Sequence, residues 1–286
     1  MRLVRTFVAA VLAAFVIATP ATAITGNFVE DNVHPYVGLL VLYDENGEFL
    51  GRCSGSLISP SLLLTAGHCV FDATSARVYF HQAAGANFDL TTEIDLTTGY
   101  PEYCIEGDPL CVTASTLLNL GYDPSNFYSP DVGLVILDQP VTFLGYASLA
   151  EAGALDVLAT QRGLQDISFT VSGYGVSRIN PVQYLSYRIR LMATERLINL
   201  RSAVNGGIYV QTTANPGGGR GGTCFGDSGG PVFYDATSTI VSVTSFGINP
   251  NCRGSDWSFR IDSADVLAWI QSVAAQYGES VTIVPI

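Results

Sequence analysis

Lysine is absent from this chain: all 13 basic residues are arginine. Acidic residues dominate, with 25 Asp and Glu side chains and a formal net charge of −12. A chain of this charge lacks the positive surface that attracts nucleic acid or an anionic membrane. We therefore expect neither as an electrostatic partner.

Long hydrophobic runs are also absent after residue 23, so the mature chain offers no stretch of 18 apolar residues that could span a bilayer. Residues 1–23 differ. Arg2 and Arg5 precede an apolar stretch over residues 7–17, and Ala21-Thr22-Ala23 forms a small-residue cleavage site. This pattern predicts a secretory signal peptide, with a retained anchor as the alternative. Its removal takes two arginines and leaves a formal charge of −14.

Histidine is scarce, with three residues, and no two cysteines lie at the short spacing of a structural zinc site. We therefore expect no metal and no required cofactor. The six cysteines all lie beyond the signal peptide, which favours three disulfides in an oxidising compartment. The sequence alone allows 15 pairings of six cysteines.

Short β-rich runs bounded by turn residues dominate the rest of the chain and predict an all-β fold. The predicted strands cover residues 37–43, 48–52, 56–58, 62–65, 132–137, 184–192, 208–211, 231–234, 239–245 and 257–261. Residues 44–47 (DENG) predict the hairpin turn between the first two. One helix is predicted near the C-terminus, where Ser263 can cap apolar residues that recur at helical spacing from Val266 to Tyr277.

Two distant motifs and one aspartate indicate nucleophilic chemistry. Residues 226–231 (GDSGGP) place Ser228 among small residues, and residues 65–69 (TAGHC) contain His68. Asp131 begins an apolar run that can carry its carboxylate to the rim of a buried strand. A serine hydroxyl needs a base to take its proton, and a carboxylate can orient that base.

In this order and context, these segments resemble those of the trypsin/chymotrypsin-like serine proteases, and the resemblance covers the chain after residue 23. It implies two six-stranded antiparallel β-barrels closed by a C-terminal helix. Residues 24–286 would form one peptidase domain. We place its N-terminal barrel at about 24–150 and its C-terminal barrel at about 151–286.

The resemblance also implies a catalytic triad. Ser228 would attack the scissile carbonyl, His68 would shuttle the proton, and Asp131 would orient His68. The backbone N–H groups of Gly226 and Ser228 would form the oxyanion hole.

The same resemblance selects three disulfides, Cys53–Cys69, Cys104–Cys111 and Cys224–Cys252. It further implies that a new N-terminus at Ile24 pairs with Asp227, so that signal removal itself would create the active form. Cleavage elsewhere followed by further processing is the alternative.

Six positions are expected to bind substrate: Gly222, Thr223, Ser245, Phe246, Gly247 and Asp256. Gly222 stands where trypsin has its specificity aspartate, so an ordinary trypsin pocket is excluded. Asp256 could accept a basic P1 side chain from the opposite wall. If it points away, the pocket is neutral and prefers apolar or aromatic P1 residues.

The separation between His68 and Asp131 is long for the family, with the excess over residues 97–127. Two interpretations remain open for this segment, a surface insertion and a loop that rims the substrate cleft.

These expectations together describe a secreted, monomeric serine endopeptidase that acts on protein or peptide substrates. A non-catalytic homologue that serves as a binding module is the alternative. An esterase of the α/β-hydrolase type is disfavoured, because that fold runs Ser, Asp, His along the chain and this one runs His, Asp, Ser.

Overall fold

The computed structural model describes most of the chain that follows the predicted signal peptide. The described residues are 24–84, 104, 106–159, 166–180, 183–185, 188–201 and 206–286. The predicted signal peptide, residues 1–23, lies outside them. Within the described residues, no helix is long and apolar enough to cross a membrane.

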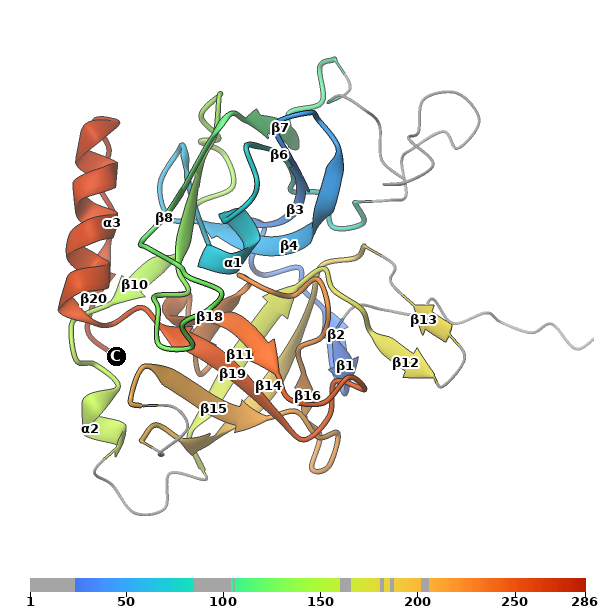
Figure 1. The fold of residues 1–286 in the computed structure, drawn as a ribbon. Helices are drawn as coiled ribbons and strands as arrows, with labels where there is room; N and C mark the ends of the chain where they lie inside the picture. The colour runs from blue at the N-terminus through green and yellow to red at the C-terminus, as the bar shows by residue number, and fades with distance from the viewer. Residues whose placement is uncertain are drawn as a thin grey trace, which may run out of the picture.

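A seven-stranded antiparallel sheet forms the first barrel, in the upper half of Figure 1. In spatial order its strands are β7 (Cys111–Ala114), β6 (Ser75–Tyr79), β3 (Val37–Tyr43), β4 (Phe49–Leu57), β5 (Leu62–Thr65), β9 (Gly133–Ile136) and β8 (Thr116–Asn119). Every residue of β3 is buried. The hairpin turn between β3 and β4 is held by Asp44, whose Oδ1 accepts hydrogen bonds from the N–H groups of Asn46 and Glu48, both at 2.8 Å.

The second sheet closes on itself below the first barrel (Figure 1). Its ring consists of β17 (Pro231–Tyr234), β11 (Ser168–Gly173), β14 (Leu191–Asn199), β15 (Tyr209–Thr213), β19 (Ser255–Arg260) and β18 (Thr239–Gly247), and β17 pairs with both β11 and β18. The predicted all-β fold of two barrels is confirmed. The first barrel has seven strands on an open path, and the second is a closed ring of six.

Further short strands either extend the second barrel or form small separate sheets. β10 (Ser148–Ala150) lies parallel to β18 and to β20 (Ile283–Val284), and β12 (Arg178–Asn180) pairs with β13 (Gln183–Leu185). At the start of the described chain, β1 (Thr25–Gly26) pairs with β16 (Gly221–Gly222), and β2 (Phe28–Glu30) pairs with β14. The first residues after the predicted signal peptide therefore lie against the second barrel, although they precede the first barrel in the sequence.

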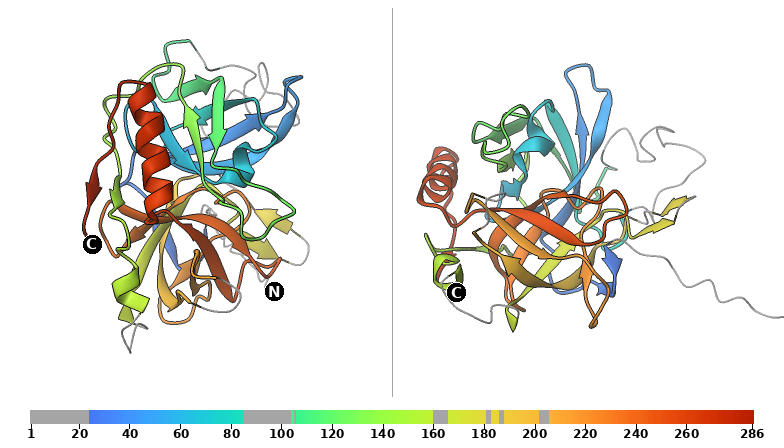
Figure 2. Two further views of the ribbon diagram at one scale, coloured as in Figure 1. Left: turned by 60° about the vertical axis from the view of Figure 1, so that its left-hand side comes forward. Right: turned by 60° about the horizontal axis from the view of Figure 1, so that its bottom comes forward.

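Three helices are present in the described residues: α1 (Gly67–Val70), α2 (Asp156–Ala159) and α3 (Ala264–Gln276). Ser263 caps α3 by accepting a hydrogen bond from Val266 N at 3.3 Å. The apolar face of α3 packs into the same core as β3, so this C-terminal helix lies beside the first barrel (Figures 1 and 2).

Several segments differ from the sequence-based prediction. The strands predicted over residues 48–52 and 56–58 form the single strand β4. The strand predicted over residues 184–192 is interrupted, because β13 ends at Leu185, β14 begins at Leu191, and Arg188 has a left-handed φ of 56°. The segment 97–127 is not simply a surface insertion, because it contributes β7 and β8 to the first barrel. Residues 85–103 and 105 lie outside the described residues.

Candidate active site

His68 and Asp131 are brought together by the pairing of two buried strands. β5 ends at Thr65, which pairs with Gly133 at the start of β9. The helical turn α1 follows β5 and carries His68, whereas Asp131 immediately precedes β9. A side chain on Gly133 would collide with Ala66 O, so glycine permits this close approach.

Asp131 holds His68 through three hydrogen bonds. The imidazole Nδ1 lies 3.1 Å from Oδ1 and 2.9 Å from Oδ2, and the backbone N–H of His68 donates to Oδ1 at 2.8 Å. The Ser245 hydroxyl donates to Oδ2 at 2.5 Å. This geometry favours a proton on Nδ1 and leaves Nε2, which lies 3.7 Å from Cys69 Sγ, as the basic nitrogen.

The carboxyl group of Asp131 is almost fully buried, with an exposed fraction of 2%. Burial by itself raises the pKa of Asp131, but the hydrogen bond and charge of His68, together with the Ser245 hydroxyl, lower that pKa below its usual value. Asp131 is therefore ionised at neutral pH and can stabilise a protonated imidazole.

Ser228 lies in a tight turn that docks against the first barrel. Its carbonyl oxygen accepts a hydrogen bond from Ser54 N at 2.8 Å. Gly229 has a φ of 75°, and a side chain there would collide with Thr65 Oγ1. The turn therefore brings Ser228 to the end of β5, from which the chain continues to His68. Within the described residues, Ser228 Oγ makes no hydrogen bond to His68.

Gly226 precedes Ser228 by two residues and has a φ of 96°, which glycine adopts without strain. Its carbonyl oxygen accepts a hydrogen bond from Ser54 Oγ at 2.9 Å. This contact fixes the orientation of the loop that contains the N–H groups of Gly226 and Ser228.

Asp227 is completely buried beneath this loop. It accepts hydrogen bonds from Gly175 N at 2.8 Å and Cys224 N at 2.9 Å. Burial raises the pKa of Asp227 to about 7, although these two backbone donors act in the opposite direction. Within the described residues, Asp227 makes no ion pair with any basic group.

Ile24 is also fully buried and packs into the core of the second barrel. Its φ of 62° is unusual for a β-branched residue. The next residue, Thr25, pairs with Gly222 and donates its hydroxyl to Cys252 O at 3.1 Å. These contacts anchor Thr25 beside the predicted substrate pocket. No hydrogen bond or ion pair joins Ile24 to Asp227 in the described chain, where residue 24 still follows Ala23.

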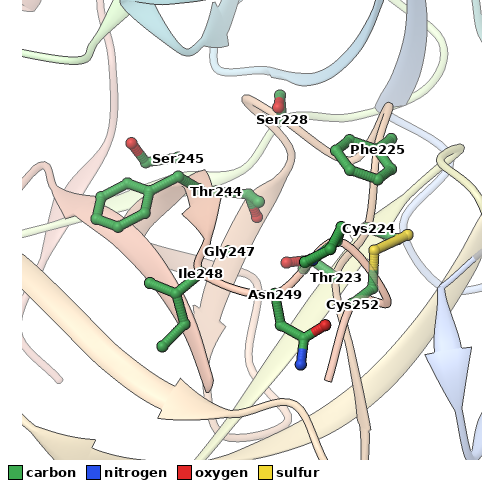
Figure 3. Close-up of a pocket in the computed structure, with 12 residues that line it drawn as sticks. Thr223, Cys224, Phe225, Ser228, Thr244, Ser245, Gly247, Ile248, Asn249 and Cys252 are labelled. Carbon is green, nitrogen blue, oxygen red and sulfur yellow. A yellow bond between two sulfur atoms is a disulfide. The ribbon is translucent and has the colours of Figure 1, made fainter. Parts of the chain in front are cut away.

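A pocket of about 430 Å³ opens beside Ser228 (Figure 3). It is lined by Thr223, Cys224, Phe225, Ser228, Thr244, Ser245, Phe246, Gly247, Ile248, Asn249, Pro250 and Cys252. The walls are two chain segments joined by the Cys224–Cys252 disulfide. Each of these lining residues is either apolar or polar without a charge.

Four of the six predicted substrate-binding residues line this pocket: Thr223, Ser245, Phe246 and Gly247. Gly222 and Asp256 do not. Asp256 has an exposed fraction of 4%, and its Oδ2 accepts hydrogen bonds from Thr223 N at 2.5 Å and Thr223 Oγ1 at 2.8 Å. The carboxylate therefore lies behind Thr223 and not on the pocket surface.

Sequence reasoning missed several residues of the site. Ile248, Asn249 and Pro250 follow the predicted strand and complete the pocket rim. Glu195 lies behind Asp256 and is 1% exposed. The alternation of buried residues along β14 places Glu195 on the inner face of the barrel, and this alternation is the signal that could have identified it.

The remaining disulfides lie outside the pocket. Cys53 is joined to Cys69, next to His68, and Cys104 is joined to Cys111 at the start of β7. Ligand atoms of Cys53, His68 and Cys69 lie within 4.8 Å of one another. Both sulfurs are consumed by the disulfide, so this cluster does not offer the thiolates that a zinc site needs.

Comparison with known sequences identifies several related proteins. The Trypsin family profile matches residues 23–270. Trypsin zeta of Drosophila erecta is 24% identical over 269 residues, which cover 90% of this chain and 87% of that protein. CLIP domain-containing serine protease B15 of Anopheles gambiae is 27% identical over 231 residues, which cover 78% of this chain but 61% of that longer protein.

Two solved structures share the fold. HL collagenase superposes with a TM-score of 0.65 at 21% identity, with 88% of this chain and 98% of that chain covered. The scabies mite inactivated protease paralogue S-D1 superposes with a TM-score of 0.61 at 15% identity, with 89% and 98% covered. At these identities the likeness shows the arrangement of the barrels alone.

Proposed function

Because the chain belongs to the trypsin family, we propose that it is a secreted serine endopeptidase that hydrolyses protein or peptide substrates. The observation that carries this proposal is the buried Asp131, which holds Nδ1 of His68 near the end of the strand against which the Ser228 turn docks. The pocket beside Ser228 supports it, since a substrate side chain can be held there during attack.

In the proposed reaction, Ser228 Oγ attacks the scissile carbonyl carbon while its proton passes to His68 Nε2. The imidazolium then gives that proton to the leaving amine, which leaves an acyl-enzyme on Ser228. A water molecule, deprotonated by His68, releases the acid product and regenerates the serine. The N–H groups of Gly226 and Ser228 would stabilise the oxyanion of both tetrahedral intermediates.

The Ser228→Ala variant tests this assignment. We expect a loss of roughly four to six orders of magnitude in kcat on peptide substrates. Wild-type protein should react with a fluorophosphonate probe, and the variant should not. Casein degradation separates an endopeptidase from a dedicated esterase. If wild-type protein leaves both casein and the probe unchanged, the binding-module alternative replaces this proposal.

That alternative has one specific motivation, because an inactivated protease paralogue shares the fold. In this chain, however, serine, histidine and aspartate stand at the three positions that the proposed chemistry needs. The loop with Gly226 is also held by Ser54. We therefore favour catalysis over binding alone.

Maturation at Ile24 forms part of the proposal. A buried ionised Asp227 without a cation is costly, and a new amino group at Ile24 would supply that cation. Release of Ile24 from Ala23 would also remove the strained φ torsion, which exists only while the preceding carbonyl carbon is bonded. The secretory signal peptidase would thus make the active enzyme.

Proteins that begin at Ile24 or two residues earlier test maturation. We expect the extended form to lose about 10²–10³-fold in kcat, because the loop with the oxyanion donors would lack its support. The Asp227→Asn variant should remove this difference by lowering the activity of the form that begins at Ile24. Equal activity of the two wild-type forms would overturn the maturation step, and N-terminal sequencing of secreted protein identifies the natural start.

For specificity, we propose that the pocket takes apolar or aromatic P1 side chains directly. Phe246, Ile248 and Pro250 line it, and no charged side chain does so among the described residues. A basic P1 residue would meet Thr223 first, with Asp256 behind. Cleavage of peptides that differ only in P1, with phenylalanine, leucine or arginine, measures this preference.

A further inference from the structure

A buried pair of carboxyl groups lies beneath the pocket and is not used by the proposed triad. Glu195 on β14 and Asp256 on β19 project to the inner face of the second barrel, and Thr212 lies on the strand between them. Both carboxyl groups are at least 96% buried. Two carboxylates so placed repel each other, and burial penalises the charge of each.

Hydrogen bonding assigns the proton within this pair. Asp256 Oδ2 accepts two hydrogen bonds from Thr223, and these stabilise the ionised form of Asp256. The Thr212 hydroxyl donates to Glu195 Oε2, whereas Glu195 Oε1 accepts no hydrogen bond within the described part of the chain. The ionisation of the two groups is linked, because the charge of Asp256 raises the pKa of Glu195. Asp256 receives two donors from Thr223 and Glu195 receives one from Thr212, so the hydrogen bonds favour the negative charge on Asp256 and the proton on Glu195.

The charged surroundings agree with this assignment. Burial, followed by the charge of Asp256, raises the pKa of Glu195 well above its usual value, and Asp227 adds to this effect. Burial raises the pKa of Asp256 too, although the Glu195 and Thr223 hydrogen bonds oppose the rise. None of these three carboxyl groups makes an ion pair within the described ranges. The pair therefore carries one negative charge over the pH range in which Asp256 is ionised and Glu195 still holds its proton.

This charge lies directly behind the pocket. Thr223 lines the pocket (Figure 3). Its hydroxyl donates a hydrogen bond to Asp256. A methyl group on Gly222 would lie 3.0 Å from Asp256 Oδ2, and one on Gly247 would lie 3.7 Å from Oδ1. Thr223 and Gly247, which both line the pocket, therefore lie close to the carboxylate, as does Gly222.

We propose that Glu195 is a specificity-determining positioning residue, which holds one proton so that Asp256 presents a single negative charge to the P1 side chain. The inference rests on the proposed endopeptidase function. It adds peptides with a basic P1 residue as a second substrate class, whose cleavage depends on the protonation of the pair. Apolar P1 side chains bind in the same pocket without using this charge.

The test compares kcat/KM for two peptides that differ only in P1, arginine or leucine, as a function of pH on the form that begins at Ile24. His68, Asp131 and Asp227 affect both substrates alike, so their titrations cancel in the arginine-to-leucine ratio. We expect the wild-type ratio to rise by about tenfold or more with pH as Asp256 ionises. It should rise again toward alkaline pH as Glu195 loses its proton.

Two isosteric variants separate these steps. Asp256→Asn should flatten the ratio at its low-pH value, while leucine cleavage continues. Glu195→Gln preserves a donor to Asp256 and an acceptor for Thr212, so its ratio should stay within about threefold of wild type at neutral pH. The later alkaline rise should disappear. Arg196→Gln is the matched control, because it also changes one charge on β14 but belongs to an exposed ion pair with Asp166, and its profile should follow wild type.

Each possible result bears either on the role of Glu195 and Asp256 or on the endopeptidase proposal. A wild-type ratio that does not change with pH, or an Asp256→Asn profile equal to wild type, overturns the inference and leaves the endopeptidase proposal intact. So does a Glu195→Gln profile that retains the alkaline rise. Failure of the wild-type protein to cleave either peptide or to react with a fluorophosphonate instead overturns the endopeptidase proposal. If Glu195→Gln does not fold, the infrared C=O band of a protonated carboxylic acid in the wild-type protein decides: its absence at neutral pH overturns the assignment.

Discussion

Two Asp–His pairs in this molecule make the same set of contacts. In each pair, Nδ1 of the histidine lies 2.9 Å from one carboxylate oxygen, and the backbone N–H of the histidine donates to the other oxygen. In each, a serine hydroxyl donates to the aspartate at 2.5 Å, from Ser172 to Asp31 and from Ser245 to Asp131. The partners are three residues apart in the pair Asp31–His34 and 63 apart in the pair His68–Asp131.

The two pairs differ in what lies beyond the imidazole. His34 is stacked on Phe233, with ring centroids 4.3 Å apart, and its side chain is 7% exposed. The His68 side chain is 28% exposed and lies at the end of β5, against which the Ser228 turn docks. A carboxylate-held imidazole thus recurs in this fold, and His81 also lies against a carboxylate, that of Asp108. Access to a nucleophile and a pocket is what distinguishes the proposed catalytic pair.

The largest expected difference between the two pairs follows when the aspartate of each pair is replaced by a neutral asparagine. Asp131→Asn should lower kcat by roughly 10⁴-fold, because the amide no longer favours a proton on Nδ1 of His68. Asp31→Asn should change kcat by no more than a few-fold. It should lower the free energy of unfolding by about 3–5 kcal/mol, because it disrupts a buried hydrogen-bonded pair.

Steady-state kinetics and denaturant unfolding on both variants measure these effects. Equal losses of activity in the two variants, at equal stability, would show that exposure of the histidine does not separate the two pairs. The lowered pKa of each aspartate gives a further check. The stability that each contributes is present above its ordinary pKa and is lost as pH falls through the lowered value.

Asp227 sharpens the comparison, because it is a third buried aspartate and has no histidine partner. Its pKa is raised from 3.8 to about 7, so the folded, uncleaved chain binds a proton more tightly than the unfolded chain. Stability must then fall as pH rises between these two values, by about 4 kcal/mol in total. A free amino group at Ile24 would remove this loss by pairing with the carboxylate.

Unfolding of Ser228→Ala protein between pH 4 and 8, either beginning at Ile24 or extended by two residues, measures the effect without self-digestion. The extended form should lose stability as pH rises, and the form that begins at Ile24 should lose much less. Asp227→Asn in the extended form is the control and should abolish the slope. The same slope in both forms would contradict pairing between Ile24 and Asp227.

The sequence predicts the parts of the site that are local in the chain. The GDSGGP turn and the apolar run after Asp131 are short patterns, and the bounds predicted for β3 and β17 agree with the structure. β11 is not among the predicted strands, although residues 168–172 alternate between polar and apolar types, and Arg188 breaks an otherwise strand-like run.

Contacts that depend on strand register could not be predicted. The Ser245 hydroxyl reaches Asp131 across 114 residues of sequence. Glu195, Thr212 and Asp256 come from three strands whose alignment is fixed only by the closure of the second barrel. The alternation along β14 indicates that Glu195 faces inward, but the residues that it meets there depend on the register between strands, which no local pattern encodes.

The smallest expected effect concerns the aromatic neighbour of each histidine. The Tyr122 ring lies 6.2 Å from His68 at the cleft, whereas Phe233 is fully buried against His34. Tyr122→Leu should lower kcat/KM by about three- to tenfold through KM, since the change reshapes the cleft beside the imidazole, and it should leave the unfolding midpoint nearly unchanged. Phe233→Leu should instead lower the free energy of unfolding by about 1–2 kcal/mol with kcat preserved, because it removes packing from the core. Peptide kinetics and denaturant titration on the two variants measure both responses. If Tyr122→Leu lost as much stability as Phe233→Leu, the two aromatic rings would serve the same structural purpose.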